Sequence, residues 1–168
     1  MTPSSHVRVA LLAWLAMLGV DFLLNAAVFA GMYQGGDTFM LAPVEAFRRI
    51  PLGYLAFLIV AFGVVEIAHR LGVAQLKGGI RLGLLLGGVV GSVWGLSLYS
   101  IATLRPAAAL AFAIIWLAIL LVGCAVAAAG LARTSLRGLA VEVAGFDAAC
   151  VVTVIALQSF GAVPTITL

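Results

Sequence analysis

Apolar residues in this chain occur in long continuous blocks, separated by short polar or glycine-containing stretches. A helix that spans a bilayer needs about 20 mostly apolar residues. Five blocks reach that length, and they cover residues 7–32, 51–72, 80–104, 107–132 and 138–160. The pattern predicts an all-α fold, a polytopic transmembrane helical bundle of five spans. At 168 residues the chain, 1–168, is expected to form a single membrane domain.

The connections between the blocks predict how the spans are arranged. All but the first are short, so sequential helices are expected to be antiparallel neighbours. Pro51 is expected to open the second span, because a proline at the first helical position loses no hydrogen bond. The first connection, residues 33–50, has an apolar side and predicts a short helix on the outer membrane surface. Arg48 and Arg49 either anchor this helix at the interface or, if it is a lid, meet anionic groups.

The basic residues predict the orientation, because Lys and Arg accumulate on the cytoplasmic side of membrane proteins. One side of the predicted bundle carries Arg8, Arg70, Lys77, Arg81, Arg133 and Arg137. The other side carries Arg48, Arg49 and Arg105. The N-terminus is therefore predicted to be cytoplasmic and the C-terminus to lie outside.

Composition excludes a soluble globule and identifies lipid as the main solvent. Hydrophobic residues make up 65% of the chain and charged residues 9%, whereas soluble domains carry about 25% charged residues. The net charge of +3 comes from scattered residues at span ends, so we expect the lipid bilayer as partner and no nucleic acid. One lysine among nine basic residues, with abundant Ala and Gly, favours a bacterial cytoplasmic membrane. The first block is too long for a cleaved signal peptide, so we expect it to be retained.

Six polar residues interrupt the predicted spans, where an ionisable group costs about 2.5–3.5 kcal/mol at the helix centre. They are Asp21, Asn25, Glu66, His69, Glu142 and Asp147. With a rise of about 1.5 Å per residue, Glu66, His69 and Glu142 fall at one level near the cytoplasmic face. Asp147 falls near the middle and Asp21 and Asn25 above it. The six residues are expected to form a sparse ladder across the membrane.

One interpretation of this ladder is structural. Glu66 then pairs with Arg70 or His69, and Glu142 with Arg137 or Arg81. Asp21 and Asp147 stay protonated, because the apolar environment disfavours the charged form, and hydrogen-bond to neighbouring helices.

Two other interpretations give the ladder a chemical role. Carboxylates and a histidine at graded depths can relay protons or cations. Glu66-Ile67-Ala68-His69 also matches the Glu-x-x-His pair of diiron bundles, but the chain has one copy of it.

No enzyme, nucleotide or metal signature is present in the sequence. His6 and His69 are its only histidines, and His6 precedes the first span, so a haem held by two histidines is not expected. Cys124 and Cys150 lie far apart in apolar blocks and are expected to be free thiols. The sequence therefore predicts no cofactor and no metal, and it favours a role other than catalysis.

Glycine recurs at every fourth position of the third span, at Gly79, Gly83, Gly87, Gly91 and Gly95. Glycines at this spacing let two membrane helices approach closely, so we interpret the ladder as a packing seam, a glycine zipper. Its expected partner is the small-residue face Gly123, Ala127 and Gly130 of the fourth span, with the third span at the centre of the bundle. The alternative is a groove lined by Ser92 and Ser97.

Short loops and small-residue faces favour an accessory or structural subunit of a membrane complex. One alternative is a small transporter, or a proton or cation permeation protein, that forms a homo-oligomer and uses the intramembrane carboxylates. A second alternative is an intramembrane enzyme acting on lipids, which needs the level of Glu66, His69 and Glu142.

Overall fold

The computed structural model of the chain describes residues 3–34, 43–101 and 105–164. Its long helices are α1 (Pro3–Leu23), α2 (Pro43–Arg70), α3 (Leu76–Ile101), α4 (Pro106–Ala132) and α5 (Arg137–Ser159). α1 continues into the π-helical turn η1 (Leu24–Val28) and the 3₁₀ turn η2 (Ala30–Gln34). Five helical segments are long and apolar enough to cross a membrane. The prediction of an all-α fold with five candidate spans is thus confirmed, and the orientation stays a prediction.

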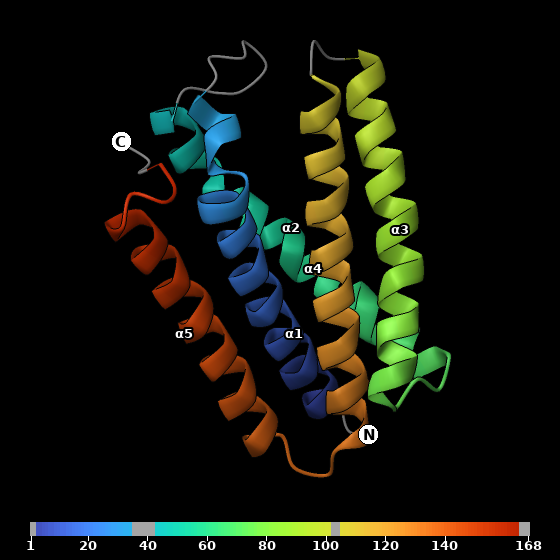
Figure 1. The fold of residues 1–168 in the computed structure, drawn as a ribbon. Helices are drawn as coiled ribbons and strands as arrows, with labels where there is room; N and C mark the ends of the chain where they lie inside the picture. Colours follow the sequence, from blue (N-terminus) through green and yellow to red (C-terminus); the bar gives the residue numbers. More distant parts are fainter. Residues whose placement is uncertain (1–2, 35–42, 102–104, 165–168) are drawn as a thin grey trace.

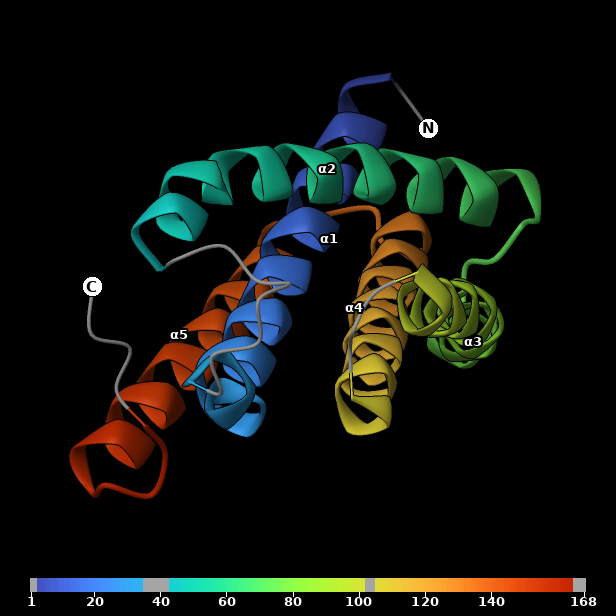
Figure 2. The same ribbon diagram turned by 90° about the horizontal axis from the view of Figure 1, so that it is seen from above.

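The helices form an open row rather than a closed bundle. α5, α1, α4 and α3 lie side by side in one layer, and α2 crosses one face of that layer obliquely (Figures 1 and 2). α1 contacts α2, α4 and α5, while α4 contacts α1, α2 and α3, so these two helices form the centre. The prediction that the third span is central was wrong. Within the described residues, α3 makes extensive contact with α4 alone.

Sequential helices are neighbours in only part of the chain. The prediction holds for α1 with α2 and for α3 with α4. α5, however, packs on α1 far more extensively than on α4. Since α1 and α5 both begin at the same end of the row, this pair is parallel (Figure 1).

The glycine ladder of α3 lies against the backbone of α4. A Cβ atom at Gly83 would lie 2.6 Å from the Cα of Leu121, and one at Gly91 would lie 2.5 Å from the carbonyl oxygen of Ala113. The other three ladder glycines also face α4. The opposite side of α3 carries bulky apolar residues that are exposed, namely Leu84, Leu85, Val89, Val93 and Leu96. α3 therefore presents glycine to α4 and large apolar side chains to the outside of the row.

The α4 residues that meet this ladder are not the ones predicted. A Cβ at Gly123 would lie 2.8 Å from the Sδ of Met17, and one at Gly130 would lie 2.8 Å from a methyl group of Val9. Both of these α4 glycines thus face α1. α4 can be central because it has two small-residue faces, and each one accepts a different helix.

Three aromatic residues fasten α2 and α3 to the centre of the row. The ring of Trp116 on α4 meets Phe57 of α2 edge-on at a centroid distance of 5.8 Å. It also stacks on Trp94 of α3 at 6.4 Å, with 4° between the ring planes. In addition, Trp14 Nε1 of α1 donates a 2.8 Å hydrogen bond to the carbonyl oxygen of Tyr54 on α2.

α2 begins earlier than predicted. Residues 43–50 continue directly into the second span, and Pro51 lies inside α2 rather than at its start. A proline there removes the hydrogen bond to the carbonyl at position 47. This loss is tolerable near the polar end of the helix, where Arg48 and Arg49 are exposed. A separate surface helix over 33–50 was therefore wrong for its second half, and residues 35–42 lie outside the described residues.

Candidate functional site

One end of the row concentrates the basic side chains. There α1, α3 and α5 begin and α2 and α4 end, so Arg8, Arg70, Lys77, Arg81, Arg133 and Arg137 share one level. We call this the basic end. Two open pockets flank the first turns of α1 at this end, one beside α2 and the other beside the connection between α4 and α5.

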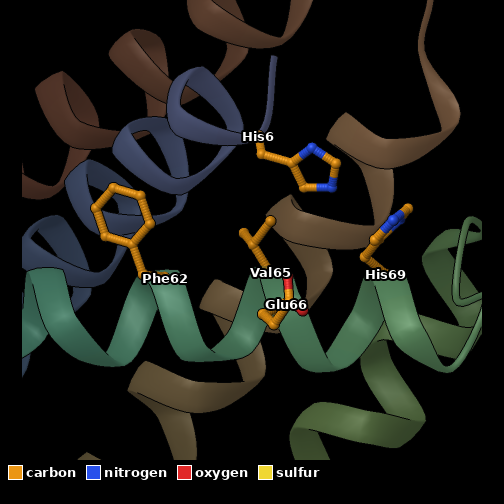
Figure 3. A pocket seen from close by; sticks show the side chains of 5 residues that line it. All are labelled: His6, Phe62, Val65, Glu66 and His69. Atoms are coloured by element: carbon orange, nitrogen blue, oxygen red, sulfur yellow. The ribbon is translucent and has the colours of Figure 1, made fainter. Parts of the chain in front are cut away.

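The first, which we call the histidine pocket, has a volume of about 410 Å³ and is lined by His6, Phe62, Val65, Glu66 and His69 (Figure 3). The rings of His6 and His69 meet edge-to-face, with centroids 4.5 Å apart and 79° between their planes. Sequence reasoning missed His6 because it precedes the apolar block. The sequence did contain a sign of this contact. α1 is expected to begin at the end of the bundle where α2 finishes, so His6 and His69 lie at the same depth.

Glu66 in this pocket forms an ion pair with a residue of its own helix, α2. Its Oε1 accepts a 2.6 Å hydrogen bond from Arg70 Nε, which is one of the two predicted pairings. Both side chains are exposed, at 51% for Glu66 and 77% for Arg70, so solvent screens the pair and it contributes little to stability. Within the described residues no group of three His, Cys, Asp or Glu side chains could hold a metal ion. The Glu-x-x-His motif thus gains a second imidazole but no metal-binding triad.

The second, which we call the arginine pocket, has a volume of about 670 Å³. It is lined by Ser5, Arg8, Leu11, Leu12, Arg133, Thr134, Ser135, Leu136, Arg137 and Ala140. Arg133 Nη2 donates a 2.9 Å hydrogen bond to Glu142 Oε2. The predicted partners of Glu142, Arg137 and Arg81, were wrong, because the short connection folds Arg133 back over the start of α5.

Asp147 lies farther along α5, at its contact with α1. A Cβ at Gly19 would collide with the Oδ1 atom of Asp147, so the carboxyl group occupies the space that glycine leaves. This Oδ1 is buried and has no hydrogen-bond partner within the described residues. A polar atom buried in this way is unusual, since buried polar groups are nearly always hydrogen-bonded.

Asp21 and Asn25 form a pair at the other end of α1. Asn25 Nδ2 donates to Asp21 Oδ1 at 2.8 Å and to the Asp21 carbonyl oxygen at 3.0 Å. From Leu24 the helix widens into the π-helical turn, a feature common at functional sites. Gln158 Nε2 of α5 donates to the carbonyl oxygen of Ala26 in that turn at 3.4 Å. This end of α1 is thus held by both local and interhelical hydrogen bonds.

The polar residues predicted to form one ladder across the membrane lie in separate parts of the structure. Residues 19 and 21 of a helix point about 200° apart. Asp147, which lies against Gly19, is therefore on the opposite side of α1 from Asp21. Glu142 pairs with Arg133 and does not line the histidine pocket, so the level expected for a lipid-acting enzyme is split in two.

No family model, no curated protein and no solved structure matches this chain. The functional interpretation therefore rests on the geometry of the helices.

Proposed function

We propose that this chain is an accessory subunit that packs against a transmembrane helix of a different membrane protein. The observation that carries the proposal is a stripe of small and polar residues on α5 that no other described element covers. The α5 stripe consists of Gly138, Glu142, Gly145, Ala149 and Thr153, all of them exposed. Another face of α5 is buried on the rest of the chain through Leu139, Val143, Cys150 and Val154.

The rest of the chain indicates what such a stripe is for. α3 turns its glycines toward α4 and its bulky residues toward lipid. α5 differs in that Gly145 faces outward, because a Cβ there would meet nothing within 4 Å, and it does so beside exposed Val141, Val152 and Ile155. In lipid, helices associate through close backbone approach and hydrogen bonds, for which small and hydroxyl-bearing residues are suited. The α5 stripe is thus suited to a second helix.

Charge favours a different protein over a second copy as the partner. In a parallel two-fold pair, the same residues of both copies meet at the same depth. The two Glu142 carboxylates would then approach one another, and like charges at such a contact are destabilising. Arg133 offsets part of this repulsion, because it pairs with Glu142 Oε2, and a partner helix with a hydrogen-bond-donating side chain at this level can complement the other carboxylate oxygen instead.

The proposal is tested by purifying the full chain from its native membrane in mild detergent. Two differently tagged copies are co-expressed, and the mass of the assembly is measured. We expect an assembly heavier than the 17.3 kDa chain that contains one tag only. Gly145→Leu is expected to release the partner. The matched control Gly88→Leu also faces open space, but lies on the lipid side of α3, so it should retain the partner.

Three outcomes would overturn this assignment. A wild-type chain that runs alone under these conditions has no stable partner. Co-purification of the two tags would identify a homo-oligomer in place of a heteromeric complex. Equal losses in Gly145→Leu and Gly88→Leu would place the contact away from the α5 stripe.

A second candidate function, proton or cation permeation, is favoured by the buried carboxyl oxygen of Asp147. An ionisable group at membrane depth marks function or a buried partner, and Oδ1 has no partner within the described residues. Liposomes that contain the purified chain should then show pH-driven or cation flux. Asp147→Asn should reduce this flux and Asp21→Asn should not, because the two carboxylates lie on opposite sides of α1. Flux equal to that of empty liposomes excludes this candidate.

A further inference from the structure

We propose that the arginine pocket binds the phosphate-bearing headgroup of an anionic phospholipid. The pocket opens at the basic end of the row, where the first turns of α1 meet the connection between α4 and α5. Headgroups lie at the ends of membrane-spanning helices, and basic pockets between such helices on the cytoplasmic side bind anionic lipids. This pocket is separate from the α5 stripe and needs no partner protein to bind a lipid.

Charge is the first argument. Arg8, Arg133 and Arg137 line the pocket, whereas no carboxylate does. Glu142 pairs with Arg133. Arg8 and Arg137 take part in no ion pair within the described part of the chain, and both are exposed. Two guanidinium groups therefore remain available, and guanidinium matches phosphate oxygens in geometry and charge.

The polar lining adds hydrogen-bond donors to these charges. Ser5, Thr134 and Ser135 bring hydroxyl groups to the pocket. The start of α5 also lies here, and neither a capping side chain nor an acidic residue occupies its first turn. The backbone N–H groups and the positive end of the helix dipole thus reinforce the preference of the arginines for an anion.

The apolar wall distinguishes a lipid from a soluble anion. Leu11 and Leu12 of α1 form part of the pocket. Above them on the same face of α1, Leu15 and Phe22 are each 41% exposed, beside Leu11 at 40%. Residues 11, 15 and 22 recur at helical spacing, so they make one apolar track that leads away from the arginines. Acyl chains can lie along this track, and a free phosphate ion makes no use of it.

The experiment titrates the detergent-purified full chain with three probes: dioleoylphosphatidylglycerol, dioleoylphosphatidylcholine and inorganic phosphate. Native mass spectrometry measures the bound lipid, and thermal unfolding measures stabilisation. We expect phosphatidylglycerol to bind most tightly. Arg8→Gln and Arg137→Gln should each weaken it roughly fivefold. Arg81→Gln is the matched control, because Arg81 is exposed at the same end but does not line the pocket.

A further variant separates the two sources of phosphate. Leu15→Gln should weaken phosphatidylglycerol and leave inorganic phosphate unaffected. Equal weakening by Arg81→Gln and Arg137→Gln would overturn the site, since it indicates attraction to basic charge in general. Inorganic phosphate that stabilises the chain as strongly as the lipid would overturn the lipid assignment. Equal binding of phosphatidylglycerol and phosphatidylcholine would overturn both the site and its assignment to an anionic lipid.

Discussion

The carboxyl group of Asp147 on α5 occupies the position that a side chain at Gly19 of α1 would fill. The two residues are far apart in sequence and belong to the parallel helices α1 and α5. Their contact buries a polar atom that has no hydrogen-bond partner within the described residues. It also places Asp147 beyond direct reach of Asp21, which separates the two carboxylates that a simple proton ladder would join.

Gly19→Ala is therefore expected to destabilise the protein by about 1–3 kcal/mol, the usual effect of overpacking. Asp147→Ala should remove this effect, because it empties the space that the new methyl group needs. Thermal unfolding of the two single variants and the double variant in one detergent measures this coupling. Gly63→Ala is the control, since a Cβ at Gly63 meets nothing within 4 Å. A Gly19→Ala penalty that persists beside Asp147→Ala would contradict the contact.

Substitutions in the α3 ladder should depend on what each glycine faces. Gly91→Ala drives a methyl group against the backbone of Ala113, so α3 must shift away from α4. We expect a loss of about 1–3 kcal/mol. Gly123→Ala should be milder, because its neighbour is the flexible end of Met17. Gly88→Ala should be neutral or stabilise by up to about 1 kcal/mol through helix propensity.

Unfolding midpoints of the Gly91, Gly123 and Gly88 variants test this order. If all three behave alike, the seam between α3 and α4 does not set the stability of this part of the fold.

Trp116→Ala should loosen both α2 and α3, because its ring lies between Phe57 and Trp94. Truncation of a large aromatic residue in a packed site costs about 3–5 kcal/mol, and the lower end is expected here, since Trp116 is partly buried. Thermal unfolding measures the loss, and near-ultraviolet circular dichroism reports the stacked tryptophan pair. Trp14→Phe is the comparison, because it removes a hydrogen bond to Tyr54 and leaves this stack intact. An unchanged spectrum in Trp116→Ala would be inconsistent with stacking.

The orientation predicted from the basic residues requires the basic end to face the cytoplasm. Alkaline phosphatase fused after Leu168 should be active in a bacterial host, while a green fluorescent protein at the same site should stay dark. Reducing the charge bias with Arg133→Glu and Arg137→Glu leaves four basic residues at the basic end against three at the other, so it should populate the inverted state in part and raise the fluorescence. Strong fluorescence from the unaltered fusion would mean that the C-terminus is cytoplasmic.

The helices could be predicted from the sequence, but their partners could not. Span length and composition follow from single residues and the bilayer thickness, and they located all five helices. Residues 43–50 were the main error, because Pro51 resembles a helix start and the chain instead continues through it. The glycines of α3 indicated a close contact with α4, yet the α4 residues involved depend on which of its two small faces meets α1.

The candidate sites also combine features that the sequence predicts with features that only the tertiary structure reveals. The sequence by itself determined that the chain is helical, that five segments are long and apolar enough to cross a membrane, and which ionisable residues fall within them. These properties depend on local composition. Only the tertiary structure decided that His6 meets His69, that Arg133 rather than Arg137 binds Glu142, and that Asp147 lies against Gly19. The physical reason is that the contacts of a helix face depend on which helix packs against it. A mostly apolar sequence contains little information about which helix that is.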